Sequence, residues 1–245
     1  MKMHPVLAII LLMAPILLSG GIALRIPVQQ ARLRLFLAFS AAYLFAIAIM
    51  HMLPEAFHDN NVKQVGLFIV IGFCSQLLID TFSTGIEHGH VHLHSKDCHS
   101  HLPLGIIVGL FLHSFLEGLP VYDIHESGYG NVNYQLILGL AVHNLPITIA
   151  FVALLKEHES QKTKRIMLLL LFAAMTPLGY LTSFALQSFG LSNYETYGQL
   201  AYAMVIGIFL HISTAILFET SDQHKYNIRK VLVMLAGIVV AYLFS

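Results

Sequence analysis

The sequence predicts an all-α membrane protein, a polytopic bundle of eight transmembrane helices that forms a single domain over residues 1–245. Of its residues, 57% are hydrophobic and only 11% are charged. A mean hydropathy of +0.74 describes a chain that would not stay soluble as one globule. A length of 245 residues leaves room for about eight spans of about 20 residues each with short connections. The zero formal net charge argues against a nucleic-acid partner.

Apolar runs bounded by charged or turn residues set the eight spans. We expect them over residues 5–24, 33–54, 65–84, 103–122, 135–155, 166–187, 198–219 and 228–244. The first run could instead be a signal peptide, since Lys2 precedes it and Ser19 lies near its end. Arg25, Arg32 and Arg34 follow this run, which favours a first span whose N-terminus lies outside.

The distribution of Lys and Arg predicts that both termini are extracytoplasmic, because cytoplasmic loops of membrane proteins are enriched in these residues. In this orientation Lys2 and Lys63 lie outside, and the other eleven of the thirteen cations lie in cytoplasmic loops. We therefore expect a multi-pass protein of the cell (inner or plasma) membrane, in contact with the lipid bilayer. The cytoplasmic cations are Arg25, Arg32, Arg34, Lys96, Lys156, Lys162, Lys164, Arg165, Lys225, Arg229 and Lys230.

The fourth and fifth spans carry metal-binding side chains at membrane depth, where such groups usually line a site or a pathway. His113 and Glu117 are four residues apart, so an imidazole and a carboxylate share one helix face. His143 lies at a similar depth in the fifth span, near Pro146, which frees a backbone carbonyl. Two imidazoles and a carboxylate suit Zn²⁺ and other first-row divalent ions. The alternative is that these side chains only hydrogen-bond within the bundle.

Four local patterns occur together in the order and spacing of one family. The run from His113 to Gly118 (HSFLEG) lies in the fourth span, and the run from His143 to Pro146 (HNLP) lies in the fifth. Residues 176–179 (TPLG) lie in the sixth span, and residues 51–56 (HMLPEA) end the second. With a histidine-rich loop between spans three and four, the chain resembles the ZIP family of zinc and iron transporters over essentially its whole length.

The resemblance implies a transporter rather than an enzyme, one that imports divalent metal ions into the cytoplasm by alternating access. The ion would be Zn²⁺ first, with Fe²⁺, Mn²⁺ or Cd²⁺ as alternatives, and it would bind near the bilayer midplane between spans four and five. Because family members are often dimers, a homodimer is the expected assembly.

The resemblance also carries a departure at the metal site. Several relatives bind two ions with additional glutamates in the fifth and sixth spans, whereas Ile147 and Thr176 stand at those positions here. We therefore expect one transported ion. Its expected ligands are His113, Glu117 and His143, with Ser114 and Asn144 as weaker or water-mediated partners.

A histidine-rich segment, residues 87–102, forms the predicted cytoplasmic loop between spans three and four. Its alternating His-x-His pattern places imidazoles on one side of an extended chain, so the composition alone predicts metal binding. The loop could receive, buffer or sense the ion, or it could be a linker whose histidines matter little for transport. Its candidate ligands are His88, His90, His92, His94, Cys98, His99 and His101.

Other polar residues lie toward the ends of the spans. His51 and Glu55 could form part of an entrance at the outer end of the second span, although Pro54 between them marks a helix end. Asp80, near the inner end of the third span, is either part of an acidic exit vestibule or an interfacial anchor. For His211 in the seventh span we expect packing with a satisfied ring nitrogen rather than metal ligation.

Two other functions are weighed against import. A zinc-dependent intramembrane hydrolase needs an open coordination position and a general base beside the metal. The sequence contains no His-Glu-x-x-His, and Glu117 would be both a ligand and the only carboxylate. A metal efflux carrier would need the same ligands, because nothing in the composition sets the direction of transport.

Overall fold

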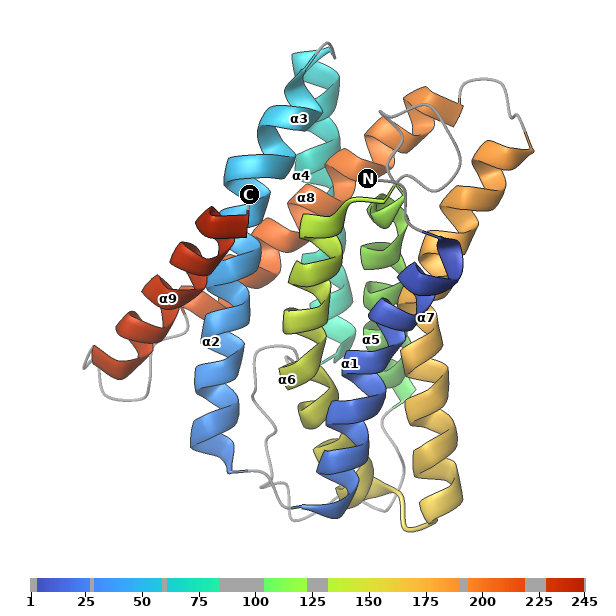
Figure 1. Cartoon of the computed structure of the whole chain (residues 1–245), viewed down its shortest axis with the longest axis vertical. Helices are drawn as coiled ribbons and strands as arrows, with labels where there is room; N and C mark the ends of the chain where they lie inside the picture. Colours follow the sequence, from blue (N-terminus) through green and yellow to red (C-terminus); the bar gives the residue numbers. More distant parts are fainter. Residues whose placement is uncertain are drawn as a thin grey trace.

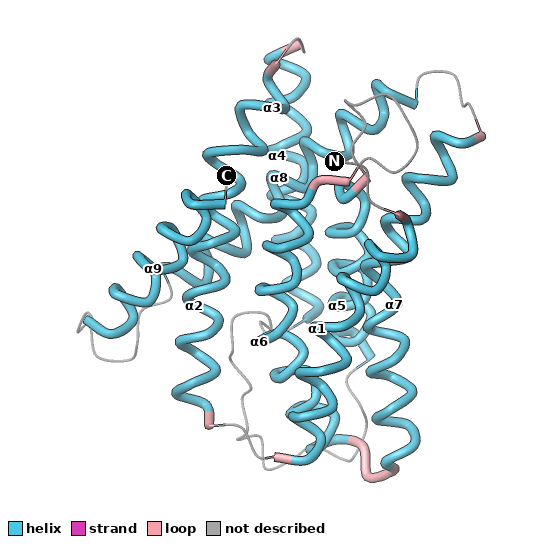
Figure 2. Tube along the Cα trace, viewed as in Figure 1, coloured by secondary structure: helices cyan, strands magenta, loops and turns pink. Residues whose placement is uncertain are grey.

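The computed structural model is a bundle of mostly long helices (Figures 1 and 2). It describes residues 4–26, 29–58, 61–83, 104–122, 132–189, 194–218 and 228–244. The described elements are α1 (Pro5–Arg25), α2 (Gln30–Ile47), the π-helical turn η1 (Ala48–Met52), α3 (Leu53–Phe57), α4 (Val62–Ser83), α5 (Leu104–Gly118), the 3-10 turn η3 (Leu119–Val121), α6 (Tyr134–His158), α7 (Lys162–Ser188), α8 (Tyr194–Phe218) and α9 (Ile228–Phe244).

The helices confirm the predicted class of polytopic helical bundle. Seven spans in the described residues are long and apolar enough to cross a membrane. The eighth predicted span corresponds to α9, whose 17 residues are at the lower limit of spanning length. In lipid, every backbone polar group must be bonded internally, and helices satisfy this requirement within each segment.

The second span is longer than the sequence predicts. Helical structure was expected to end at Pro54, but α2, η1 and α3 follow one another from Gln30 to Phe57. Proline is tolerated in the first turn of a helix, where its missing N–H would have no partner. In the wider turn of η1 the N–H of Leu53 bonds the carbonyl of Ala48, five residues back, and Pro54 follows directly. The π turn thus carries the helix past the proline.

The cations that the described helices carry are concentrated at one end of the bundle. Arg25 ends α1, Arg32 lies in the first turn of α2, and Lys156 lies in the last turn of α6. These helix ends and the start of α7 all lie at the bottom of Figure 1, whereas the start of α1 and the end of α9 lie in its upper half. The grouping agrees with the expected topology, and the assignment of this end to the cytoplasm stays a prediction.

The four most extensive helix contacts fall within two groups of helices, although α2 also packs on α6 about as extensively as on α8. In the first, α1 packs on α6 and α7, and α5 packs on α7. In the second, α4 packs on α8, and α2 packs on α8 and α9. Contacts of α2 with α6 and of α4 with α5 join the two groups.

Paired glycines bring α5 and α7 to backbone contact. A Cβ atom on Gly118 would lie 2.0 Å from the carbonyl oxygen of Thr176, and one on Gly179 would lie 2.1 Å from the carbonyl oxygen of Phe115. Neither position has space for a side chain, because the obstacle is backbone in both cases. The two glycines therefore fix how α5 lies against α7.

We expect Gly118→Ala to lower the free energy of unfolding by about 2–3 kcal/mol, because the added methyl group must displace the backbone of α7. Gly66→Ala in α4 is the matched control, since a Cβ atom there meets nothing within 4 Å and alanine favours the helix. Thermal unfolding of the purified protein in detergent compares the two. Equal midpoints would show that α5 and α7 are not held at this distance.

Candidate metal centre

The buried face of α5 carries two of the predicted ligands. Ile106, Leu110, His113 and Glu117 recur at spacings of three and four residues, so they share the face that α5 turns toward the bundle interior. The side chains of His113 and Glu117 are both 0% exposed. The helical period that buries the apolar residues of α5 therefore also places an imidazole and a carboxylate in the interior.

Helix α6 supplies the third ligand from the centre of the bundle. In the most apolar stretch of α6, 67% of the residues are buried, whereas 22% are buried in the corresponding stretch of α4. The side chain of Asn133 caps the helix, accepting a hydrogen bond from the N–H of Leu136 at 2.9 Å. From this start, α6 runs without interruption past His143 and Pro146 to His158. His143 lies on the buried part and has no exposed surface.

The side chains of His113, Glu117 and His143 meet at one point. Oε1 of Glu117 lies 2.9 Å from Nε2 of His113 and 3.5 Å from Nε2 of His143. The two imidazole rings lie 6.1 Å apart and nearly perpendicular, at 81°. Two ligand atoms bound to one tetrahedral Zn²⁺ are about 3.3 Å apart, since each lies about 2.0–2.1 Å from the ion. The three ligand atoms all lie within 4.8 Å of one another, so the cluster could hold a divalent ion once the side chains move closer together.

Three neutral polar side chains are also buried, one each on α5, α6 and α7. Ser114, Asn144 and Thr176 are at most 1% exposed. Within the described residues, the hydroxyl oxygens of Ser114 and Thr176 have no hydrogen-bond partner. The nitrogen and the oxygen of the Asn144 amide have none there either. Buried polar groups are rarely left without partners, and a bound ion or its water ligands would supply them.

An aromatic cluster closes the bundle next to the metal-binding residues. The ring centroids of Phe111, Phe151 and Phe172 lie 5.1–6.0 Å apart and come from α5, α6 and α7 respectively. Phe111 precedes His113 on α5, and Phe151 follows His143 on α6, so the cluster lies on the side of the cation-rich end. This packing separates the metal-binding residues from that end of the bundle.

The remaining predicted residues have three different outcomes. Ile147 and Thr176 are buried at 1% and 0% exposure, so neither position adds a carboxylate to the interior. Glu55 lies apart from the cluster and accepts a hydrogen bond from Tyr202, while His51 is half-buried on η1. The predicted loop ligands, His88 to His101, lie outside the described residues.

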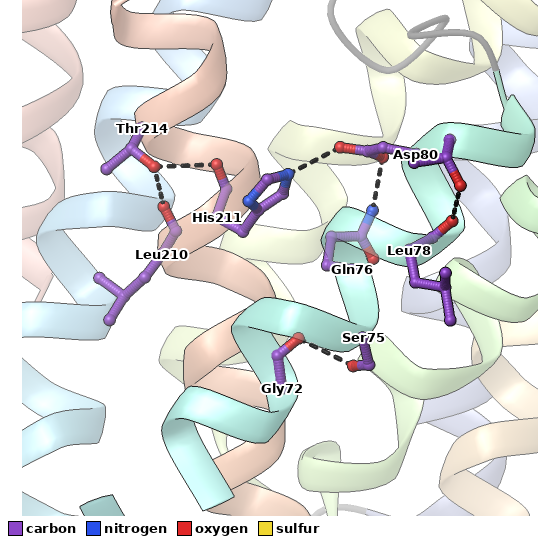
Figure 3. A network of polar contacts seen from close by, with 9 residues as sticks. Gly72, Ser75, Gln76, Leu78, Asp80, Leu210, His211 and Thr214 are labelled. Carbon is purple, nitrogen blue, oxygen red and sulfur yellow. Dashed lines mark hydrogen bonds and ion pairs between the residues drawn. The ribbon is translucent and has the colours of Figure 1, made fainter. Parts of the chain in front are cut away.

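A second polar cluster, between α4 and α8, was only partly predicted (Figure 3). Nε2 of His211 lies 2.8 Å from Oδ2 of Asp80, and Nε2 of Gln76 donates to Oδ1 of the same carboxylate at 3.1 Å. The ring of Phe73 lies edge-on to the imidazole, with centroids 4.8 Å apart. His211 thus has the satisfied ring nitrogen that the sequence predicts, but its partner lies 131 residues away.

Comparison with known proteins gives one family. The family model described as ZIP Zinc transporter matches residues 4–106 and 103–245, which together cover almost the whole chain. No curated protein matches the chain.

We expect the His113–Glu117–His143 cluster to bind one divalent ion in the purified protein. Co²⁺ can replace Zn²⁺ as a coloured probe, and residues 88–101 are deleted so that the loop histidines do not bind it. His143→Ala should weaken Co²⁺ binding at least about 100-fold, because it removes one of three ligands. His158→Ala, at the end of the same helix, is the control. Undiminished binding by the His143 variant would show that this imidazole is not a ligand.

Proposed function

Because this chain belongs to the ZIP zinc transporter family, we propose that it imports divalent metal ions, Zn²⁺ first among them, through the His113–Glu117–His143 cluster. The family is one of transporters rather than enzymes, so the chain is a divalent metal transporter and not an intramembrane hydrolase. The finer points, namely the ion, its path and its direction, are proposed from the residues.

The observation that carries the proposal is the complete burial of a carboxylate and two imidazoles on spanning helices. An ionisable group at membrane depth is costly to bury and is retained mainly where it binds an ion or lines a path. Here the three groups also come within 4.8 Å of one another. A purely structural role would be served by any one hydrogen-bonded pair.

The ligand set supports Zn²⁺ as the main substrate. Imidazole nitrogen with one carboxylate oxygen suits borderline ions, whereas Mg²⁺ and Ca²⁺ require oxygen ligands. Fe²⁺, Mn²⁺ and Cd²⁺ remain alternative substrates, since affinity for such a site does not by itself select among these divalent ions. One ion is proposed at a time, because Ile147 and Thr176 provide no second carboxylate.

Alternating access is supported by the burial of all three ligands, whose side chains have no exposed surface. The Phe111–Phe151–Phe172 cluster lies toward the cation-rich end, and η3 lies toward the opposite end. The ligands are carried by α5 and α6, which belong to the first helix group, α1, α5, α6 and α7. Movement of this group against α2, α4, α8 and α9 would open the cluster first to one side and then to the other.

The positive-inside rule supports a proposed orientation, and the family supports a proposed direction. The cation-rich end is proposed as the cytoplasmic end, which places both termini and Glu55 outside. We place the protein in the cell membrane, as a homodimer, with the histidine-rich loop at the cytoplasmic exit. Efflux is the alternative direction, because the ligand set binds the ion equally well from either side.

We expect His113→Ala and His143→Ala each to abolish uptake of radioactive zinc into cells, because each removes one of three ligands. Deletion of residues 88–101 should slow or deregulate uptake without abolishing it. His158→Ala is the control for loss of a histidine from α6. Normal uptake by both ligand variants would mean that those histidines are structural.

The direction is tested with the same variants in cells preloaded with radioactive zinc. Import predicts that the intact protein raises accumulation and that loss of His113 removes this rise. Faster loss of preloaded zinc, dependent on His113, would instead establish efflux.

A further inference from the structure

A hydrogen bond joins two helices that are far apart in the sequence, at the end of the bundle proposed to face outside. The hydroxyl of Tyr202 on α8 donates to Oε2 of Glu55 on α3 at 2.5 Å. This length is typical of a hydrogen bond to an ionised carboxylate. Tyr202 is 6% exposed and Glu55 is half-buried, so the contact lies at the edge of the interior. The carboxylate is therefore held by α8 while remaining near solvent.

The ring of Tyr202 also lines a cavity of about 230 Å³. Its other walls include Leu119 and Pro120 of η3, Ser183 of α7 and Ala201 of α8. A water molecule occupies about 30 Å³, so the space is large enough for a divalent ion with several water ligands. Tyr202 thus joins a carboxylate to a cavity of the size that an incoming ion requires.

The cavity lies beside the end of α5 that carries Glu117. Leu119 follows Glu117 by two residues, so η3 separates the cavity from the ligands on α5. The hydroxyl of Ser183 donates to the carbonyl oxygen of Leu119 at 2.8 Å, which holds η3 to α7. Tyr202 belongs to α8, in the other helix group. The cavity therefore lies at the boundary where the two groups would separate.

The helix that carries Glu55 has an irregular start. The π turn η1 precedes α3, and such turns occur frequently at functional sites. Pro54 follows this turn, and Glu55 lies in the first turn of α3. Glu55 thus lies on a short helix whose orientation depends on a turn that does not follow regular α geometry.

We propose that Glu55 and Tyr202 form the outer gate of the ion path. When the gate is closed, the hydroxyl of Tyr202 occupies an oxygen of the Glu55 carboxylate. When the contact breaks, that oxygen becomes available to an incoming Zn²⁺ beside the cavity that Tyr202 lines. The ion and the hydroxyl compete for the same oxygen, so arrival of the ion favours opening. The gate rests on the proposed function, because it requires an ion that travels to Glu117.

The first test follows access to the cavity and does not depend on transport. Ser183→Cys is introduced with Cys74→Ser and Cys98→Ser, and intact cells are treated with a membrane-impermeant thiol reagent. Adding Tyr202→Phe should raise the labelling rate at least about fivefold, because it removes a hydrogen bond to a charged acceptor and keeps the ring. Tyr242→Phe, on the exposed side of α9, is the control and should leave the rate unchanged. Equal labelling of all three proteins would overturn the gate.

The second test separates binding at the gate from the transport step. Glu55→Gln should raise the Michaelis constant for Zn²⁺ uptake about fivefold or more while the maximal rate is kept, since the ligands of the cluster are intact. A merely structural bond predicts a lower maximal rate with an unchanged Michaelis constant, and that result would overturn the gate alone. A parent protein that carries no Zn²⁺ would be a different result, the failure of the proposed function itself.

Discussion

The burial of the Glu117 carboxylate in the middle of spanning helices is the constraint on which the rest of the structure depends. A charge without exposed surface needs a compensating partner, and the ionisable groups within 4 Å of it in the described residues are His113 and His143. Neutral imidazoles can donate hydrogen bonds, but they cannot cancel a negative charge. The buried charge of Glu117 is therefore best compensated when a cation occupies the site. This is expected of a binding site along an ion path.

Close packing keeps this carboxylate in place. Gly118, the next residue, lies against the carbonyl of Thr176, and the hydroxyl of Ser183 on α7 donates to the carbonyl oxygen of Leu119, so the end of α5 is held against α7. The ring of Phe111, two residues before His113, packs against those of Phe151 and Phe172. Close-packed protein interiors are poorly compressible. Relocation of the ligands consequently requires helices to move together, because a local rearrangement of α5 would break these contacts.

The sequence predicted those features that depend on short stretches of chain. The eight spans follow from local hydropathy, and the pairing of His113 with Glu117 follows from helical spacing. The continuation of α2 past Pro54 was missed, because a π turn gives no signal in residue periodicity. Tyr202 and Asp80 find their partners 147 and 131 residues away. Such contacts depend on which helices pack together, and one sequence does not determine that.

The replacement of additional carboxylates by Ile147 and Thr176 is consistent with a site for one ion. With Glu117 ionised and both imidazoles neutral, the three-residue cluster carries a charge of about −1 when empty and about +1 with one divalent ion, by simple addition of formal charges. The cost of burying a charge depends on its magnitude and little on its sign. Binding of the ion stabilises the loaded cluster, and the net charge that the helices bury around the empty cluster has the same magnitude. A carrier that alternates between its two sides needs both closures, one to deliver the ion and one to return empty.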